Sequence, residues 1–128
     1  MAYIEPYVAE IATEAMAVPE SPLDALIRAK SSEFEVNLAL VREIIRRESG
    51  FVPDVCNRQY GCKAGQGLMQ LIPSRVKECS QRLGREIDPL IAEDNLDCGL
   101  YLLQQDGIRH WSDPDGKWGS GDYSAFLN

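Results

Sequence analysis

The pattern of apolar and polar residues along this chain is helical throughout, and proline and glycine residues separate its segments. Apolar side chains recur at spacings of three and four residues, which places them on one face of each helix. We therefore expect an all-α fold. The spacing predicts helices over residues 7–17, 22–33, 38–48, 73–83 and 95–106, with a short helical turn over 67–71.

Residue types that favour helix ends stand at the predicted boundaries. Asn37 is a good N-cap for the helix over 38–48, and Gly50 is placed to end it. The later helices are bounded in the same way by Pro73 with Ser74, by Gly84, by Asp94 or Asn95, and by Gly107. These boundaries leave a long loop over 51–66, and long loops of this kind are more often functional than structural.

Glu48 lies on the apolar face of its helix. Val41, Ile44 and Ile45 precede it by seven, four and three residues, so all four side chains share one face. The C-terminal end of a helix also disfavours negative charge. Burial and the helix dipole both raise a carboxyl pKa, which is how a general acid is kept protonated near neutral pH. The alternative is a glutamate at the rim of the face that reaches water or pairs with an arginine.

Three motifs follow one another along the chain. The first is Glu48-Ser49-Gly50-Phe51-x-Pro53, the second is Gly67-Leu68-Met69-Gln70-x-x-Pro73-Ser74, and the third is Asp94-Asn95-Leu96-x-x-Gly99 followed by Tyr101-Leu102. In this order and spacing they closely resemble the soluble lytic transglycosylases, lysozyme-like enzymes that cleave the glycan strands of bacterial peptidoglycan. The third motif has one residue fewer between its glycine and its tyrosine than the family pattern. The resemblance covers about residues 22–111.

The resemblance implies a single lysozyme-like domain of the goose-type or soluble lytic transglycosylase kind. It implies that Glu48 acts alone as acid and then base, since the sugar supplies its own nucleophile. The product would be a 1,6-anhydromuramoyl end, after cleavage of the β-1,4 bond between N-acetylmuramic acid and N-acetylglucosamine. The residues expected to line the substrate groove are Ser49, Gln66, Gly67, Leu68, Met69, Gln70, Asn95 and Tyr101.

Structural roles remain open for several of these residues. Leu68 and Met69 would equally suit the core, Ser49 would suit a water-facing helix end, and Asn95 is more readily explained as a helix cap. Gly67 is expected to let the backbone approach a sugar closely. Gln70 is expected to donate to and accept from an N-acetyl group. The aromatic residues Trp111 and Trp118 would stack on sugars or serve as buried anchors.

The chain lacks the later Tyr-Asn-x-Gly motif whose tyrosine approaches the catalytic glutamate in the family. Tyr101 or Tyr123 would substitute for it, or the helper is absent. One rival interpretation is a hydrolytic lysozyme on the same fold, with Asp54, Asp94 or Asp97 as a second carboxylate. Another is a cell-wall-binding module without activity. Serine or cysteine hydrolase chemistry fits poorly, because the chain has one histidine and no Gly-x-Ser-x-Gly motif.

Four cysteines suit an envelope protein with two disulfides, although four cysteines allow three pairings. We favour Cys79–Cys98, which would join two helices, and Cys56–Cys62, which would close a short loop beside the helix that carries Glu48. Free buried thiols are the alternative. A zinc site is disfavoured because no Cys-x-x-Cys occurs, and no other metal or cofactor is expected.

The composition is that of one globular domain of 128 residues. A net charge of −7 argues against nucleic acid as a partner and gives no attraction to anionic membranes. No segment is long enough to insert into a membrane, and the first residues do not resemble a signal peptide. The expected partner is the peptidoglycan glycan strand, met by a monomer in the periplasm, the cell envelope or the extracellular space. A mature form, phage delivery and a secretion machine are all compatible routes.

The expected organisation has three parts. Residues 1–21 form a helix and linker, residues 22–111 the catalytic domain, and residues 112–128 a tail rich in glycine and aspartate. The tail is expected to pack back on the domain through its aromatic residues, or to be partly mobile.

Overall fold

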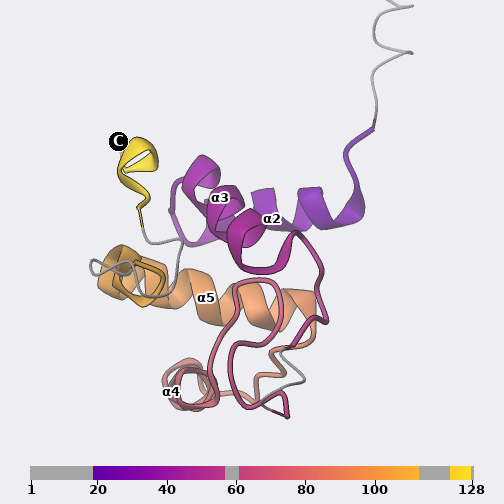
Figure 1. The fold of residues 1–128 in the computed structure, drawn as a ribbon, viewed down its shortest axis with the longest axis vertical. Coiled ribbons are helices and arrows are strands. Elements are labelled where there is room, and N and C mark those ends of the chain that lie inside the picture. Colours follow the sequence, from indigo (N-terminus) through magenta and orange to yellow (C-terminus); the bar gives the residue numbers. More distant parts are fainter. Residues whose placement is uncertain (1–18, 57–60, 113–121, 128) are drawn as a thin grey trace, which may run out of the picture.

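The computed structural model describes residues 19–56, 61–112 and 122–127. Within these ranges there are helices and turns but no strand, so the expected all-α class is confirmed (Figure 1). The predicted helix over 7–17 and Trp118 lie outside the described residues. The elements in chain order are α2 (Pro22–Glu33), α3 (Leu38–Ser49), α4 (Pro73–Leu83), α5 (Ala92–Asp106), η2 (Gly107–His110) and η3 (Ser124–Phe126).

Helix α5 is the central element of the domain. In Figure 1 it runs between the α2–α3 pair and α4, and it packs against both α2 and α4. Its residues are buried on more than one face, because neighbouring elements cover it on several sides. Leu96, Leu100 and Leu103, which follow one another at spacings of four and three residues on this helix, are all buried in the core. The α5 helix therefore provides the fixed base against which the loops of the site pack.

Most helix ends lie where the sequence places them. The Asn37 side chain accepts a hydrogen bond from the Leu40 amide at 3.1 Å, as an N-cap does. Gly50 and Gly84 end α3 and α4 with φ of 61° and 70°, a left-handed conformation that glycine adopts without strain. Local chemistry alone therefore defines these boundaries.

Two local predictions are wrong. Helix α5 begins at Ala92 after the N-cap Ile91, so neither Asp94 nor Asn95 caps it. The segment expected to be helical over 67–71 is a tight turn, which we call the motif turn (residues 66–71). Gln66 and Leu71 exchange both backbone hydrogen bonds at 3.0 Å each, and Gln70 has a φ of 52°, which an α-helix does not allow.

The two expected disulfides, Cys56–Cys62 and Cys79–Cys98, are both present. No free cysteine remains, so the alternative of buried thiols is excluded. Cys79–Cys98 joins α4 to α5 inside the core, because both residues are fully buried.

We expect the Cys79–Cys98 bridge to be the more stabilising of the two. Its sequence separation is 19 residues against 6 for Cys56–Cys62, and a cross-link restricts the unfolded chain more when its loop is longer. Replacing Cys79 and Cys98 by alanine should lower the free energy of unfolding by about 3 kcal/mol, and the same change at Cys56 and Cys62 by about 2 kcal/mol. Urea unfolding of both double variants checks this order, and equal losses would contradict it.

Candidate active site

The Glu48 carboxyl lies at the end of the apolar face of α3. Val41, Ile44 and Ile45, which share that face, are fully buried, so the last turn of the helix is anchored in the core. Glu48 itself is half-buried, and burial raises the pKa of its carboxyl above the ordinary value. Such a carboxyl stays protonated closer to neutral pH, which suits a proton donor.

The arginines that neighbour Glu48 in sequence do not neutralise it. Arg46 and Arg47 both bind Glu43 one turn earlier, Arg47 through its Nε at 2.8 Å. Hydrogen bonds from Arg46 and Arg47 lower the pKa of Glu43 to about 2. In the described part of the chain no ion pair involves Glu48, so the expected alternative of an arginine-paired glutamate does not hold. The Glu43 carboxylate is thus held charged, whereas the Glu48 carboxyl favours its neutral form.

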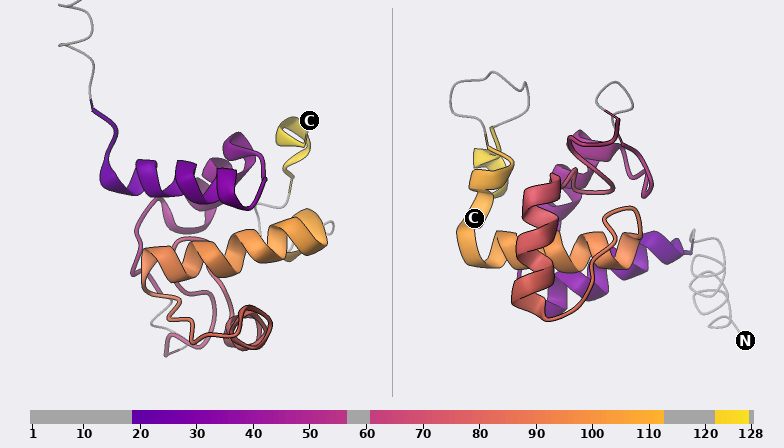
Figure 2. Two further views of the ribbon diagram at one scale, coloured as in Figure 1. Left: turned by 180° about the vertical axis from the view of Figure 1, so that it is seen from behind. Right: turned by 90° about the horizontal axis from the view of Figure 1, so that it is seen from below.

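Arg47 also attaches residues 122–127, the C-terminal segment, to the end of α3. Figure 2 shows this segment beside the helix. Its Nη1 donates to the Asp122 carbonyl at 2.7 Å, and its guanidinium lies 4.3 Å from the centre of the Tyr123 ring. Tyr123 is only 2% exposed. Its pKa is raised first by burial and then by the negative charge of Glu48. The fold therefore brings Tyr123 within electrostatic range of Glu48 from the far end of the sequence.

Tyr101 is the other tyrosine that remained open from the sequence. Tyr101 is half-buried on α5 and lies beside Arg82 of α4, whose guanidinium pKa is raised by the tyrosine.

A single side chain of α5 holds the motif turn in place. Asn95 is fully buried, and its Oδ1 accepts a hydrogen bond from the Met69 amide at 2.9 Å. Its Nδ2 donates to the carbonyls of Gln66 at 2.9 Å and Pro89 at 2.8 Å. Asn95 therefore fastens two loops to the central helix, and the capping role expected for it is wrong.

Gly67 is needed because the motif turn passes very close to Asn95. A Cβ on Gly67 would lie 2.0 Å from the Pro89 carbonyl oxygen and 2.4 Å from Asn95 Nδ2, and its φ of 73° also favours glycine. The close approach that the glycine permits is to the protein itself, whereas the sequence suggested an approach to a sugar.

Leu68 and Met69 pack as core residues. Both are fully buried, and a Cβ on Gly99 of α5 would lie 2.2 Å from the Met69 sulfur. The Trp111 indole nitrogen donates to the Met69 carbonyl at 2.9 Å, so Trp111 is a buried anchor. Neither the Leu68 nor the Met69 side chain lies where it would touch a sugar.

The side chain of Gln70 folds back on its own turn. Its Nε2 donates to the carbonyls of Val55 at 3.2 Å and Gly67 at 2.9 Å. A glutamine amide has two protons, so both are used within the loop, and only the side-chain oxygen remains to accept from a ligand.

Gln66 and Ser49 are also half-buried and also bind backbone. Gln66 donates to the Cys62 carbonyl, and Ser49 Oγ donates to the Ile45 carbonyl at 3.1 Å, one turn back in α3. Together with the bonds of Gln70, these bonds stiffen the last turn of α3 and the motif turn.

A family model for the transglycosylase SLT domain matches residues 25–109, which include Glu48, the whole motif turn and Asn95. The chain belongs to the transglycosylase SLT family. Comparisons with curated proteins and with solved structures gave no match. The resemblance found in the three motifs is thereby confirmed, and it indicates a lytic transglycosylase-type domain whose family acts on peptidoglycan.

The SLT domain offers Glu48 no free carboxylate partner at Asp94 or Asp97, the two aspartates of α5 that were considered from the sequence. Asp97 binds Lys30 at 2.7 Å and also contacts Arg85, while Asp94 binds Arg85 at 2.8 Å. Both are held in a network that joins α5 to α2 and to the loop after α4. Asp54, the third residue considered from the sequence, is exposed in the loop after α3.

The described part of the SLT chain contains no group of three or more histidine, cysteine, aspartate or glutamate side chains placed to hold a metal ion. None of its described helices has the length and apolar character needed to cross a membrane. The two disulfides fit a location outside the cytoplasm.

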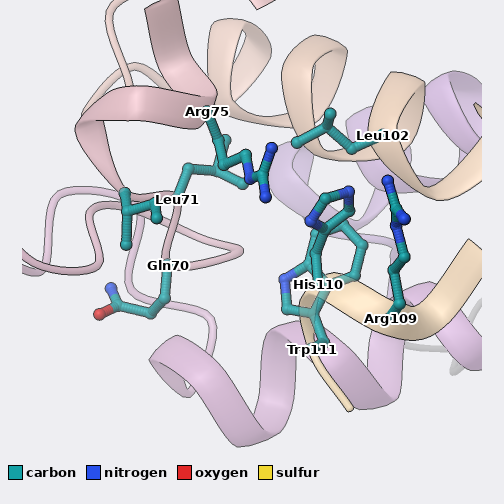
Figure 3. Close-up of a pocket in the computed structure, with 8 residues that line it drawn as sticks. Gln70, Leu71, Arg75, Leu102, Arg109, His110 and Trp111 are labelled. Carbon is teal, nitrogen blue, oxygen red and sulfur yellow. The ribbon is translucent and has the colours of Figure 1, made fainter. Parts of the chain in front are cut away.

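A pocket of about 250 Å³ lies next to the motif turn (Figure 3). No role could be assigned to its basic residues from sequence, because Arg75 lies on α4, Arg109 and His110 lie on η2, and none of them belongs to the three motifs. Only the folded chain brings them together. The lining residues are Gln70, Leu71, Ile72, Arg75, Leu102, Arg109, His110 and Trp111.

Proposed function

We propose that this SLT domain is a peptidoglycan lytic transglycosylase, which cleaves the β-1,4 bond between N-acetylmuramic acid and N-acetylglucosamine and leaves a 1,6-anhydromuramoyl end. The observation that carries the proposal is the state of Glu48. It is half-buried, its pKa is raised by burial, and no described cation pairs with it. A carboxyl in this state is suited to donate a proton and then to take one back.

In the proposed reaction, protonated Glu48 gives its proton to the glycosidic oxygen as the bond from that oxygen to C1 of N-acetylmuramic acid breaks. The N-acetyl group of the sugar stabilises the positive charge that develops at C1. The Glu48 carboxylate then removes the proton from the C6 hydroxyl, whose oxygen bonds to C1. Glu48 ends the cycle protonated, and no water is consumed.

One carboxyl group is sufficient for this sequence of steps, and that fits the surroundings of Glu48. A hydrolase would need a second carboxylate to hold or replace a water molecule. Asp94 and Asp97 are occupied by Arg85 and Lys30, which supports the transglycosylase over a muramidase that would use either of them. Asp54 is exposed on the loop after α3 and is the carboxylate that a muramidase would have left to use.

Tyr123 is the residue that we propose for the role of the tyrosine in the family's Tyr-Asn-x-Gly motif. Its buried ring lies beside Arg47 and within range of the Glu48 charge. Its hydroxyl would stabilise the Glu48 carboxylate that forms when the proton leaves. The motif turn and Asn95 would then serve as the scaffold that shapes the groove around these two groups.

Removing the Tyr123 hydroxyl should therefore slow the reaction. Since a hydrogen bond to a charged group contributes about 1.5–3 kcal/mol, Tyr123→Phe should lower kcat about tenfold or more with little change in KM. Tyr101→Phe is the matched control, because that hydroxyl lies beside Arg82. Steady-state kinetics on isolated glycan strands would compare the two, and equal losses in both variants would contradict the assignment.

The products of digestion test the proposed function itself. Purified peptidoglycan would be incubated with the protein and the released muropeptides analysed by mass spectrometry. Ends with 1,6-anhydromuramoyl groups are expected. Reducing ends would identify a muramidase instead, and binding to the wall without any release would identify a wall-binding module. We further propose that the domain acts as a monomer outside the cytoplasm.

A further inference from the structure

The pocket next to the motif turn combines basic side chains with an apolar floor. Arg75 comes from α4, and Arg109 and His110 come from η2. In Figure 3 the His110 ring lies between the two guanidinium groups. Leu71 and Leu102 are buried and supply the apolar part. Three basic side chains gathered in one hollow stand out on a protein with a net charge of −7.

Each of these basic groups is held in position by an acid that does not line the pocket. Glu78 binds Arg75 at 3.0 Å, while Asp106 binds Arg109 at 3.3 Å and His110 at 2.8 Å. A guanidinium has five N–H donors, so an acid on one edge orients it and leaves donors for a ligand. Arg75 and Arg109 are therefore oriented in advance for a group that accepts hydrogen bonds in pairs, as a carboxylate does.

The pocket is continuous with the proposed glycan site. Gln70 and Leu71 belong to the motif turn and also line the pocket. Trp111 lines it as well, and its indole holds the Met69 carbonyl of the same turn. A ligand in the pocket would thus lie beside the sugar chain. The volume of about 250 Å³ is below that of most sites for a separate small molecule, roughly 300–1,000 Å³, and suits a branch of a polymer.

We propose that this pocket binds the carboxylates of the peptide stem that a muramoyl residue carries, so that the protein prefers peptide-bearing glycan over stripped glycan. The proposal rests on the proposed function for its choice of polymer. The stem leaves the sugar through the lactyl group and has free carboxylates, which match the two arginines. Its aliphatic parts match the apolar floor. Removing the stem exposes the carboxylate of the lactyl group. That carboxylate is the alternative ligand for the two arginines.

A binding measurement separates these sources and needs no catalysis. The probes are N-acetylmuramoyl-L-alanyl-D-glutamyl-lysine and N-acetylmuramic acid, each titrated into the wild type and the double variant Arg75→Gln/Arg109→Gln. Since a charge-assisted hydrogen bond is stronger than a neutral one, the wild type should bind the peptide-bearing probe at least about tenfold more tightly. The double variant should bind both probes equally.

Arg82→Gln is the matched control, because it removes the same charge from α4 and another contact to Glu78 at 3.5 Å, yet lies outside the pocket. It should keep the wild-type preference. Equal affinity of the wild type for both probes, or the same loss of preference in the control, would overturn the proposal.

The rate of cleavage is then measured on intact glycan strands and on strands from which an amidase has removed the peptide stems. The double variant should lose about tenfold in rate on intact strands and little on stripped ones, whereas equal losses on both would assign the pocket to the sugar or its lactyl group. If the wild type cleaves neither substrate while the binding preference is present, the proposed reaction fails and the peptide site stands.

Discussion

Replacing Glu48 by glutamine is expected to abolish most of the activity while making the folded protein more stable at neutral pH. Glutamine has nearly the same shape but can neither give nor take a proton. Because the proposed reaction uses Glu48 as both acid and base, its rate should fall by at least about 10³-fold. Release of anhydromuramoyl products from peptidoglycan measures this loss, and circular dichroism verifies that the variant is folded.

The expected gain in stability follows from the sign of the pKa shift. Burial raises the pKa of Glu48 in the folded protein above its unfolded value of about 4.3. Between the unfolded pKa and the folded pKa, the folded state keeps a proton that the unfolded chain has already lost. The stability of the folded protein therefore declines as pH rises from the first pKa through the second. Glutamine does not ionise, so Glu48→Gln should be more stable than the wild type at pH values above the folded pKa of Glu48. Below about pH 4 the variant should have no such advantage.

Glu43→Gln is the matched control, since it makes the same chemical change on the same helix with the opposite expectation. Arg46 and Arg47 lower the pKa of Glu43 to about 2. Its contribution to stability is present above the unfolded pKa and is lost as pH falls through about 2. Glu43→Gln should therefore be less stable than the wild type at neutral pH. Urea unfolding at pH 7 and pH 4 would compare the variants, and a loss of stability in both at pH 7 would contradict the role assigned to Glu48.

The helix boundaries were predictable because they depend on neighbouring residues. Asn37 caps α3 with its own side chain, and Gly50 ends the helix through its own conformation. Asn95 misled the same reasoning, because an asparagine near a helix start is usually a cap. Its side chain instead binds the Met69 amide, 26 residues away in sequence, and this contact has no local signal.

The position of the acid was also predictable from spacing, whereas its surroundings were not. The apolar face of α3 identifies Glu48, because helical periodicity is a local property. The bond between Arg47 and the Asp122 carbonyl spans 75 residues, and it brings Tyr123 to the site. The basic pocket likewise depends on α4 and η2 meeting across the motif turn. Contacts of this kind arise from tertiary packing, which a periodic pattern does not encode.

Sequence motifs identify a site without separating the residues that touch a ligand from those that support it. In the second motif, Leu68 and Met69 are fully buried and the Gln70 amide protons are used within the loop. This motif builds a rigid turn that is bonded to the loop after α3 through the Val55 carbonyl. Asn95 of α5 makes two of the hydrogen bonds that hold this turn and a third to the Pro89 carbonyl, which makes it the critical structural position of the site.

Asn95→Ala is accordingly expected to be the most destabilising single substitution in the site. It removes three hydrogen bonds at once, one of them buried and two partly buried. The Met69 amide and the Pro89 carbonyl lose their partner, whereas the Gln66 carbonyl still accepts from the Leu71 amide at 3.0 Å. Leaving buried polar groups unsatisfied costs about 1–3 kcal/mol each, and partial relaxation of the loops reduces the sum. We expect a loss of about 4 kcal/mol in the free energy of unfolding.

Asn37→Ala provides the matched comparison, because the same side chain is removed from a position with a single local hydrogen bond. A lost N-cap costs about 1 kcal/mol, so the two alanine variants should differ by about 3 kcal/mol in urea unfolding. If the two losses were equal, Asn95 would not be what holds the motif turn. At urea concentrations below the point where Asn95→Ala unfolds, its activity should also fall, because the motif turn would no longer have a fixed position on α5.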